Sequence, residues 1–302
     1  MADGPILVAG RSGQVAQAIC QRAARSGFDL VAVGRPELDL ANPASIADLT
    51  ERIPACAIVN AAAYTDVDAA EGDVERAFAV NREGAARLAR VAVQRNIPYL
   101  YISTDCVFDG TKPSPYREDD IPHPISVYGE SKLAGENAVR EACPAAVVLR
   151  TSWVYSSCQG NFVTRLLPLA ETKDVVQVVD DQRGGPTAAA DLADAILDIV
   201  VRLMGGNGSY AGIYHIAGQG ETSRHEFAQA IFAGWGRRGR RTPRLEPIAS
   251  VTLADRARRP LNSRFDCSKL ATTFGIRLPP WQISLDAVLD ELADIGAREA
   301  ER

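Results

Sequence analysis

Short apolar runs alternate with longer segments of helical spacing through the first half of the chain, and this alternation constrains the fold more than any other feature. Each run is short enough for a buried strand, and the segments between the runs repeat apolar residues at helical spacing. Strands that alternate with helices pair in parallel, because each helix carries the chain back across the sheet. The sequence therefore predicts an α/β fold with a doubly wound parallel sheet. The expected strands are residues 6–9, 30–33, 57–59, 99–102 and 146–150.

The composition excludes several classes of protein. The chain has 302 residues, 46% of them hydrophobic, and a net charge of −5, so it can bury a core and offers no basic surface for nucleic acid. The six cysteines lack CxxC pairs and share no ligand spacing with the three histidines, so we expect reduced thiols and no metal site. No apolar stretch reaches the ~18 residues of a membrane span. We therefore expect a cytoplasmic protein without membrane or nucleic-acid partners.

A glycine turn connects the first expected strand to the first expected helix. Gly10 and Gly13 lie there in the pattern GxxGxxA. Glycines let the backbone approach a pyrophosphate, and the N-terminus of a helix offers free N–H groups and a partial positive charge. Any tight turn also favours glycine, but the position after the first strand favours dinucleotide binding. Alanines at 61–63 follow the third strand, where small residues either leave room for a ligand or pack closely.

The end of the second expected strand carries Arg35 and no acidic residue. Sites specific for NAD usually place an acid there, which binds the ribose hydroxyls. A guanidinium can instead pair with the 2′-phosphate of NADPH, although Arg35 could also be an ordinary surface residue in a turn. We therefore predict NADPH as the preferred cofactor, with NADH as the alternative.

The chain changes character after residue 150, where shorter strands are separated by turns rich in Gly and Pro. We expect residues 1–150 to form an NADP-binding, Rossmann-like domain, to which segments at about 187–210 return. Residues 151–302 are expected to form mainly a smaller substrate-binding lobe. The expected helices include residues 14–26, 43–52, 74–95, 127–141, 162–171, 191–203, 222–235 and 285–295.

A tyrosine and a lysine at helical spacing are the candidates for chemistry. Tyr128 and Lys132 lie four residues apart in YGESK, and Thr104 ends the fourth strand. The spacing puts both side chains on one face of a helix. A nearby ammonium is expected to lower the phenol pKa from ~10, which suits proton delivery to a carbonyl oxygen. A YxxxK pair alone is often a surface pair, but the preceding glycine turn and Ser-Thr strand end favour catalysis.

Together these segments resemble the extended short-chain dehydrogenase/reductase superfamily and, more narrowly, the dTDP-4-dehydrorhamnose reductases. The resemblance covers nearly the whole chain. It rests on GRSGQVA, IVNAAAYTDVDAAE, ISTDCVFDG, PISVYGESKLAGE, LRTSWVY, VVDDQRGGPT and RRPLNSRFD, which begin at residues 10, 58, 102, 124, 149, 178 and 258.

The resemblance implies reduction of the C4 keto group of dTDP-4-dehydro-L-rhamnose by NADPH, to give dTDP-L-rhamnose. The nucleotide sugar would be the partner of the protein, and a homodimer stays open. The implied catalytic residues are Thr104, Tyr128 and Lys132, and the implied substrate-binding residues are Thr104, Trp153, Arg259 and Asn262. With Arg35 added from its position, the cofactor would contact Gly10, Gly13, Gln14, Val15, Arg35, Asp39, Leu40, Ala61, Ala62, Ala63, Tyr128 and Lys132.

The chain departs from the family pattern at two places, and functions other than this reduction remain open. Cys106 stands where the family commonly has tyrosine, and the first helix lacks the glutamate that bridges a metal in some members. The alternatives are another nucleotide-sugar reductase, an epimerase or dehydratase of the same fold, or a regulatory subunit like that of methionine adenosyltransferase. A dehydratase typically has an Asp-Glu pair after the threonine, whereas Asp105 here precedes Cys106. The intact Thr104, Tyr128 and Lys132 favour an enzyme.

Overall fold

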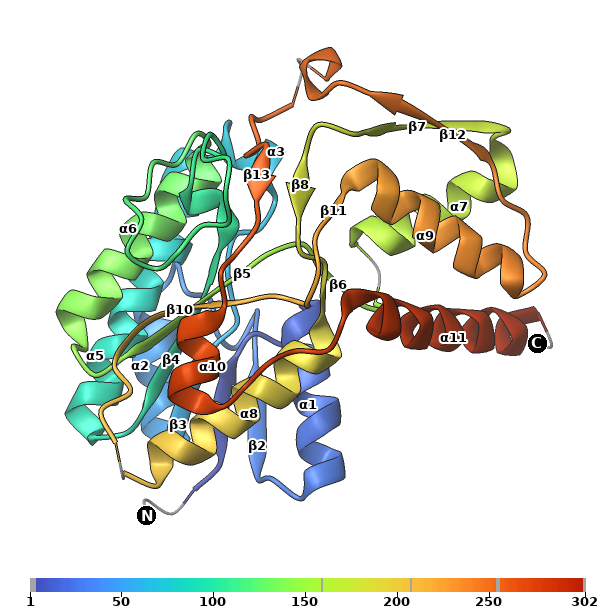
Figure 1. Cartoon of the computed structure of the whole chain (residues 1–302). Helices are drawn as coiled ribbons and strands as arrows, with labels where there is room; N and C mark the ends of the chain where they lie inside the picture. The colour runs from blue at the N-terminus through green and yellow to red at the C-terminus, as the bar shows by residue number, and fades with distance from the viewer. Residues whose placement is uncertain (1–3, 159, 207, 254–255, 301–302) are drawn as a thin grey trace.

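A computed structural model of the chain describes residues 4–158, 160–206, 208–253 and 256–300 (Figure 1). Its centre is a sheet of six parallel strands in the order β10-β5-β4-β3-β1-β2. The doubly wound parallel sheet expected from the sequence is therefore confirmed. The strands are β1 (Ile6–Ala9), β2 (Leu30–Val33), β3 (Ala57–Asn60), β4 (Tyr99–Thr104), β5 (Val147–Thr151) and β10 (Gly212–Ile216).

Helices cover both faces of the sheet, because alternate strand residues point to opposite sides and both sides are apolar. Ile6 and Val8 belong to the core on one face, whereas Leu7 and Ala9 belong to the core on the other. The first core is closed by α1 (Gln14–Ser26), α8 (Ala189–Met204) and α10 (Ser268–Phe274). The second is closed by α2 (Pro43–Arg52), α5 (Ala85–Arg95) and α6 (Val127–Ala142).

The elements at 14–26, 30–33 and 43–52 form as the sequence predicts, but two expectations need correction. The single helix expected over 74–95 is α4 (Val74–Phe78), a π-helical segment η1 (Ala79–Gly84) and α5. Apolar spacing does not distinguish a π turn from an α turn within one rod. Strand β10 also belongs to the central sheet, although it lies after the segment at about 187–210 that was expected to return to that domain. A short apolar run has the same pattern in either sheet, so the sequence could not assign it.

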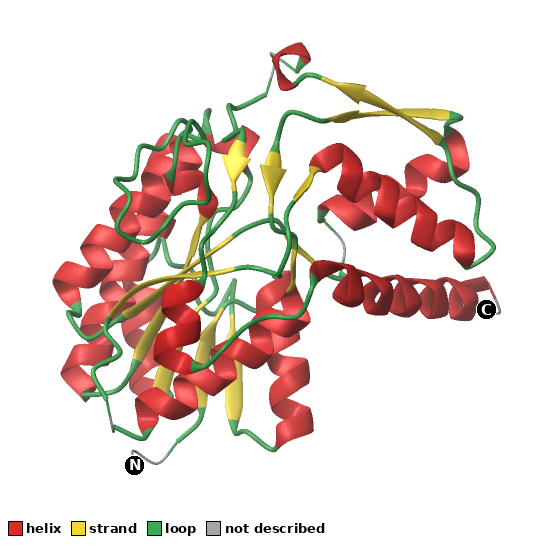
Figure 2. Cartoon of the chain, viewed as in Figure 1, coloured by secondary structure: helices red, strands yellow, loops and turns green. Residues whose placement is uncertain are grey.

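A smaller group of elements lies beside the sheet, with a third core built around Phe227, Trp235 and Trp281 (Figure 2). Its helices are α7 (Phe162–Thr172), α9 (Arg224–Arg237) and α11 (Trp281–Ala300). Its strands form the pairs β7 (Val175–Val179) with β12 (Arg244–Ile248) and β6 (Val154–Tyr155) with β9 (Thr187–Ala188). A three-stranded sheet contains β8 (Arg183–Gly184), β11 (Thr222–Ser223) and β13 (Asn262–Ser263). The short helical elements are α3 (Val67–Ala70), η2 (Asp105–Val107) and η3 (Ser250–Thr252).

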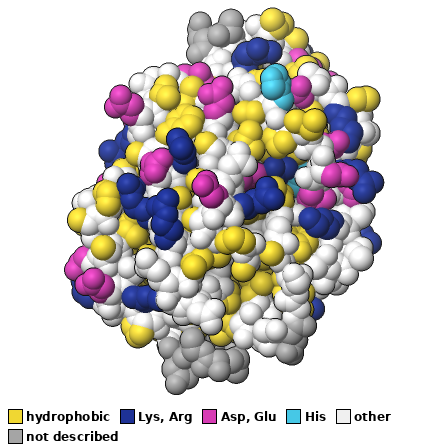
Figure 3. All heavy atoms as spheres, turned by 90° about the vertical axis from the view of Figure 1, so that its left-hand side faces the viewer, with side chains coloured by type: hydrophobic (Ala, Val, Ile, Leu, Met, Phe, Trp, Pro, Cys, Tyr) yellow, Lys and Arg dark blue, Asp and Glu magenta, His cyan; other side chains and the backbone are white. Residues whose placement is uncertain are grey.

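One face of the molecule carries charges of both signs. Basic and acidic side chains are interspersed over the face seen in Figure 3. Among the helices of the described residues, none is long and apolar enough to cross a membrane.

A buried ion pair fixes α6 to the sheet. Arg150 on β5 and Glu136 on α6 are each 1% exposed, and the guanidinium donates two hydrogen bonds to the carboxylate, at 2.6 and 2.9 Å. The Ser103 hydroxyl on β4 donates to the same carboxylate at 2.5 Å. Three elements therefore meet at one charged group, which sets the position of α6 over the ends of β4 and β5.

We predict that Arg150→Met lowers the free energy of unfolding by about 3–5 kcal/mol, because it leaves the Glu136 carboxylate buried without a cation. The double variant Arg150→Met/Glu136→Met removes both charges and should recover most of this loss. Urea unfolding of the three proteins measures the effect. Equal losses in the single and double variants would contradict a role for the unpaired charge.

Candidate active site

The glycine turn forms a cradle at the N-terminus of α1. Gly10 has φ +120°, and a Cβ there would lie 3.2 Å from the backbone of Ala61 and Ala62. A Cβ on Gly13 would meet nothing within 4 Å, so the space beside this glycine is open. The first turn of α1 carries no acidic residue to neutralise its positive end. These features fit the pyrophosphate of a dinucleotide.

The other residues expected at the cofactor lie around this turn, and some are already engaged. Gln14 Nε2 donates to the Val154 carbonyl and its Oε1 accepts from the Ser156 hydroxyl, both at 3.1 Å. The Gln14 side chain thus braces β6, leaving its backbone N–H, which the helix itself does not use, for a ligand. Leu40 is 3% exposed and packs in the core under α2 and α5, while Asp39 is half-buried beside it. Half-buried positions are also found for Val15, Ala61, Ala62 and Ala63.

Two arginines meet at the end of β2. Arg35 is exposed, and its carbonyl accepts a hydrogen bond of 2.8 Å from Nη2 of Arg11 in the glycine turn. Gly34 permits this approach, since a Cβ there would lie 3.1 Å from the Arg11 Cβ. Glu37 lies 3.3 Å from the Arg11 guanidinium. Sequence reasoning missed Arg11, although its place between the two glycines is the signal that could have found it.

Helix α6 presents Tyr128 to the turn that follows β4. Ser126 caps the helix by accepting from the Gly129 N–H at 3.2 Å. A Cβ on Gly129 would overlap the Cys106 carbonyl, so only glycine allows the first turn of α6 to lie this close to η2. The Thr104 hydroxyl donates to Asp105 at 2.9 Å and accepts from the Cys106 N–H at 3.2 Å. The Thr104 hydroxyl also acts on the pKa of Tyr128, so these two side chains lie close together.

The electrostatics of Tyr128 differ from the expectation. Burial has the largest influence on the pKa of Tyr128 and raises it above the usual value. The Thr104 hydroxyl partly opposes this rise. The lowered pKa predicted from the spacing to Lys132 is therefore wrong, because spacing does not reveal burial. Lys132 is buried as well, at 2% exposed. Burial lowers the pKa of Lys132 to about 7, with Glu136 opposing it, so the ammonium expected beside the phenol is itself destabilised.

The expected sugar-binding tryptophan is held between two residues of the smaller group of elements. Trp153 has φ +47°, an uncommon conformation for a residue other than glycine. A Cβ on Gly184 would lie 2.6 Å from the indole, so β8 packs directly on one part of the ring. The Arg224 guanidinium lies 3.6 Å from the ring centroid. Among the described residues, no carboxylate lies within ion-pair distance of Arg224, which sequence reasoning missed because it lies in no recognised motif.

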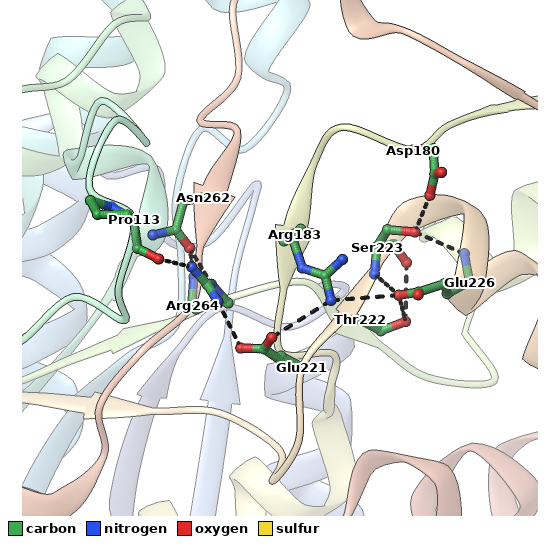
Figure 4. A network of polar contacts seen from close by, with 9 residues as sticks. All are labelled: Pro113, Asp180, Arg183, Glu221, Thr222, Ser223, Glu226, Asn262 and Arg264. Carbon is green, nitrogen blue, oxygen red and sulfur yellow. Dashed lines mark hydrogen bonds and ion pairs between the residues drawn. The ribbon is translucent and has the colours of Figure 1, made fainter.

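Arg259 and Asn262 both make contacts within the protein. Arg259 binds Asp68 with two hydrogen bonds, at 2.9 and 3.0 Å. The Asn262 amide donates to the Lys112 and Ser114 carbonyls and accepts from Arg264, so it anchors the loop after β4. Figure 4 shows how this contact continues through Glu221, Arg183 and Glu226 into α9. Contact of Arg259 or Asn262 with a substrate stays a prediction.

The described residues place no group of three or more His, Cys, Asp or Glu side chains where it could hold a metal ion. A glycine cradle at a helix N-terminus, with a Tyr-Lys pair and a threonine beside it, defines a nicotinamide-dependent dehydrogenase or reductase.

Comparison with known proteins narrows this class. The family described as RmlD substrate binding domain matches residues 4–294. A dTDP-4-dehydrorhamnose reductase of Sinorhizobium fredii is 44% identical over 280 residues, which cover 92% of this chain and 94% of that protein. The crystal structure of a dTDP-4-dehydrorhamnose reductase from Bacillus anthracis in complex with NADP has a TM-score of 0.88 at 30% identity, covering 96% and 99% of the two chains. The chain belongs to the dTDP-4-dehydrorhamnose reductase family.

We predict that Arg35→Ala weakens NADPH binding about tenfold and leaves NADH binding nearly unchanged, because only NADPH carries the 2′-phosphate. Fluorescence titration of both cofactors measures this. Arg11→Ala should act in the same direction, whereas Glu37→Ala should strengthen NADPH binding. Equal weakening of NADH and NADPH would contradict a 2′-phosphate contact.

Proposed function

We propose that this protein reduces the C4 ketone of dTDP-4-dehydro-L-rhamnose with NADPH, giving dTDP-L-rhamnose. Family membership over residues 4–294 supports this reaction. The observation that carries it is the approach of α6 to the end of β4, where the missing Cβ of Gly129 lets Tyr128 lie beside Thr104. The glycine cradle follows β1 of the same parallel sheet, in which β3 separates β1 from β4. Proton donor and cofactor can therefore reach one carbonyl.

The chemistry follows from the protonation states of these side chains. The nicotinamide, when bound, supplies the hydride. Tyr128 is a neutral phenol at neutral pH, like an ordinary tyrosine, and burial moves its pKa further upward. It therefore holds the proton that the substrate oxygen needs. With substrate bound, the Thr104 hydroxyl would turn from Asp105 and donate a second hydrogen bond to that oxygen. The Lys132 ammonium stabilises the phenolate that remains after transfer.

The surroundings of Trp153 suit a charged sugar derivative. The Arg224 guanidinium lies 3.6 Å from the centroid of the Trp153 ring, and burial lowers its pKa to about 10, so it remains a cation at neutral pH. Asp105 and Arg259 are among the charges that act on it. An unpaired guanidinium beside an indole fits a ligand with an apolar ring face and a diphosphate. Burial raises the pKa of the Cys106 thiol, so it stays neutral and is not a nucleophile.

The same reasoning supports a division of labour within the chain. Residues 1–150 would bind NADP, together with segments at about 187–210, and residues 151–302 would mainly bind the substrate. The position of Trp153 and Arg224 among β6, β8 and α9 supports this division, as does the cradle on α1.

The proposed reaction is tested with purified protein, dTDP-4-dehydro-L-rhamnose and NADPH. We expect stoichiometric loss of NADPH absorbance and a product identified by NMR as dTDP-L-rhamnose. Conversion of the sugar without net NADPH consumption would indicate an epimerase or dehydratase, and absence of any conversion would favour a regulatory protein.

We predict that Tyr128→Phe reduces kcat at least about a hundredfold, because it removes the proton donor and leaves the ring in place. NADPH binding should change little and serves as the internal control. Turnover close to that of the wild type would refute the role of the phenol.

We predict that Gly129→Ala reduces kcat by roughly a hundredfold, since the added methyl group overlaps the Cys106 carbonyl and displaces Tyr128 from Thr104. Glu130→Ala, on the exposed side of the same turn, is the matched control and should keep most of the activity. Similar kinetics for both variants would show that the close approach of α6 is not needed for catalysis.

A further inference from the structure

The buried lysine of the active site is held by two fixed acceptors. Lys132 Nζ donates to the Ile102 carbonyl at 2.6 Å and to the Tyr101 hydroxyl at 2.8 Å. The ammonium also lies 4.0 Å from the centroid of the Tyr101 ring. An ammonium has three N–H groups, so these contacts leave one for Tyr128 or for a cofactor.

The Tyr101 hydroxyl is itself oriented by the π-helical segment. Tyr101 is 0% exposed, and its Oη donates to the Asn81 carbonyl in η1 at 2.9 Å. A phenol has a single proton, so donation to Asn81 leaves only lone pairs to face Lys132. The Asn81 side chain is tied in turn to Ser131 at 2.9 Å. A Cβ on Gly135 would lie 2.6 Å from Tyr101 Oη, so α6 closes directly over this contact.

We propose that Tyr101 is a positioning residue, whose hydroxyl holds the Lys132 ammonium so that its remaining N–H faces Tyr128 and the cofactor. Lys132 lies at the end of a chain of hydrogen bonds from the backbone of η1 through β4 to α6. The effect on turnover rests on the proposed function, whereas the contact between the two side chains does not.

The charges around Lys132 determine the sign of the effect. On α6 the neighbours are Tyr128 and Glu136, and the Glu136 carboxylate, paired with Arg150 of β5, raises the pKa of Lys132. On β4 the neighbours are Tyr101 and, beyond it, Tyr99. Both tyrosines are buried, which raises their pKa values and keeps both phenols neutral. A neutral acceptor stabilises the ammonium over the amine. Its removal must lower the pKa of Lys132, and activity that needs the ammonium must then fall off at a lower pH.

The chain offers a matched control on the same strand. Tyr99 is 1% exposed, and its hydroxyl donates to the Ala85 carbonyl at 3.0 Å, as that of Tyr101 does to Asn81. Its other partner is Asn60, not Lys132. Tyr99→Phe and Tyr101→Phe therefore remove equivalent buried hydroxyls and cause similar structural loss. They differ in whether the ammonium loses an acceptor.

The experiment compares kcat against pH in the wild type and both variants. We expect Tyr101→Phe to lower kcat roughly tenfold and to move the alkaline limb of the profile about one unit toward lower pH. Tyr99→Phe should leave the limb where it is in the wild type. An unchanged limb in Tyr101→Phe, or the same shift in both variants, would overturn the proposal.

A second measurement does not depend on the reaction. The chain has four lysines, so NMR of protein labelled with carbon-13 in its lysine side chains can follow Lys132, assigned through Lys132→Met. The titration point of Lys132 should fall in Tyr101→Phe and not in Tyr99→Phe. If the wild type fails to reduce the ketosugar but this shift occurs, the proposed function fails and the positioning role stands. If reduction proceeds and the titration point does not move, the positioning role fails alone.

Discussion

The close packing of α6 on β4 is the constraint on which the active site depends. Two residues without a Cβ, Gly129 and Gly135, let the helix backbone approach carbonyl oxygens that any larger side chain would displace. Between them lies Lys132, and one residue after Gly135 comes the Glu136 carboxylate that binds Arg150. One helical face therefore carries the proton donor, the ammonium and the anchor to the sheet. Its catalytic geometry and its stability cannot be changed independently.

Much of this arrangement could be predicted from the sequence, because its determinants are local. Apolar runs predicted the strands of the sheet up to β5, and the glycines at 10 and 13 predicted the cradle after β1. The four-residue spacing of Tyr128 and Lys132 is a property of any α-helix, so it placed both on one face. These inferences need no knowledge of which distant segments meet.

What could not be predicted depends on contacts between segments far apart in the chain. Arg224 contacts Trp153 because β11 pairs with β8, and no local sequence pattern predicts that pairing. The same holds for β10, whose apolar run could have joined either sheet. The pKa of Tyr128 was predicted with the wrong sign because spacing reveals a neighbouring charge but not burial. Burial is the largest cause for both members of the pair.

The two shifted pKa values are compatible with a reductase, in which the tyrosine acts as the acid. In reduction the tyrosine must give a proton away, and a phenolate at neutral pH would have none to give. Tyr128 is protonated at neutral pH and holds that proton, and its raised pKa makes it a weaker acid than a free phenol. Burial of Lys132 brings its pKa to about 7, so few interactions stabilise its charged form. Each acceptor around that ammonium then matters, because a charge near its midpoint responds strongly to the loss of a single hydrogen bond.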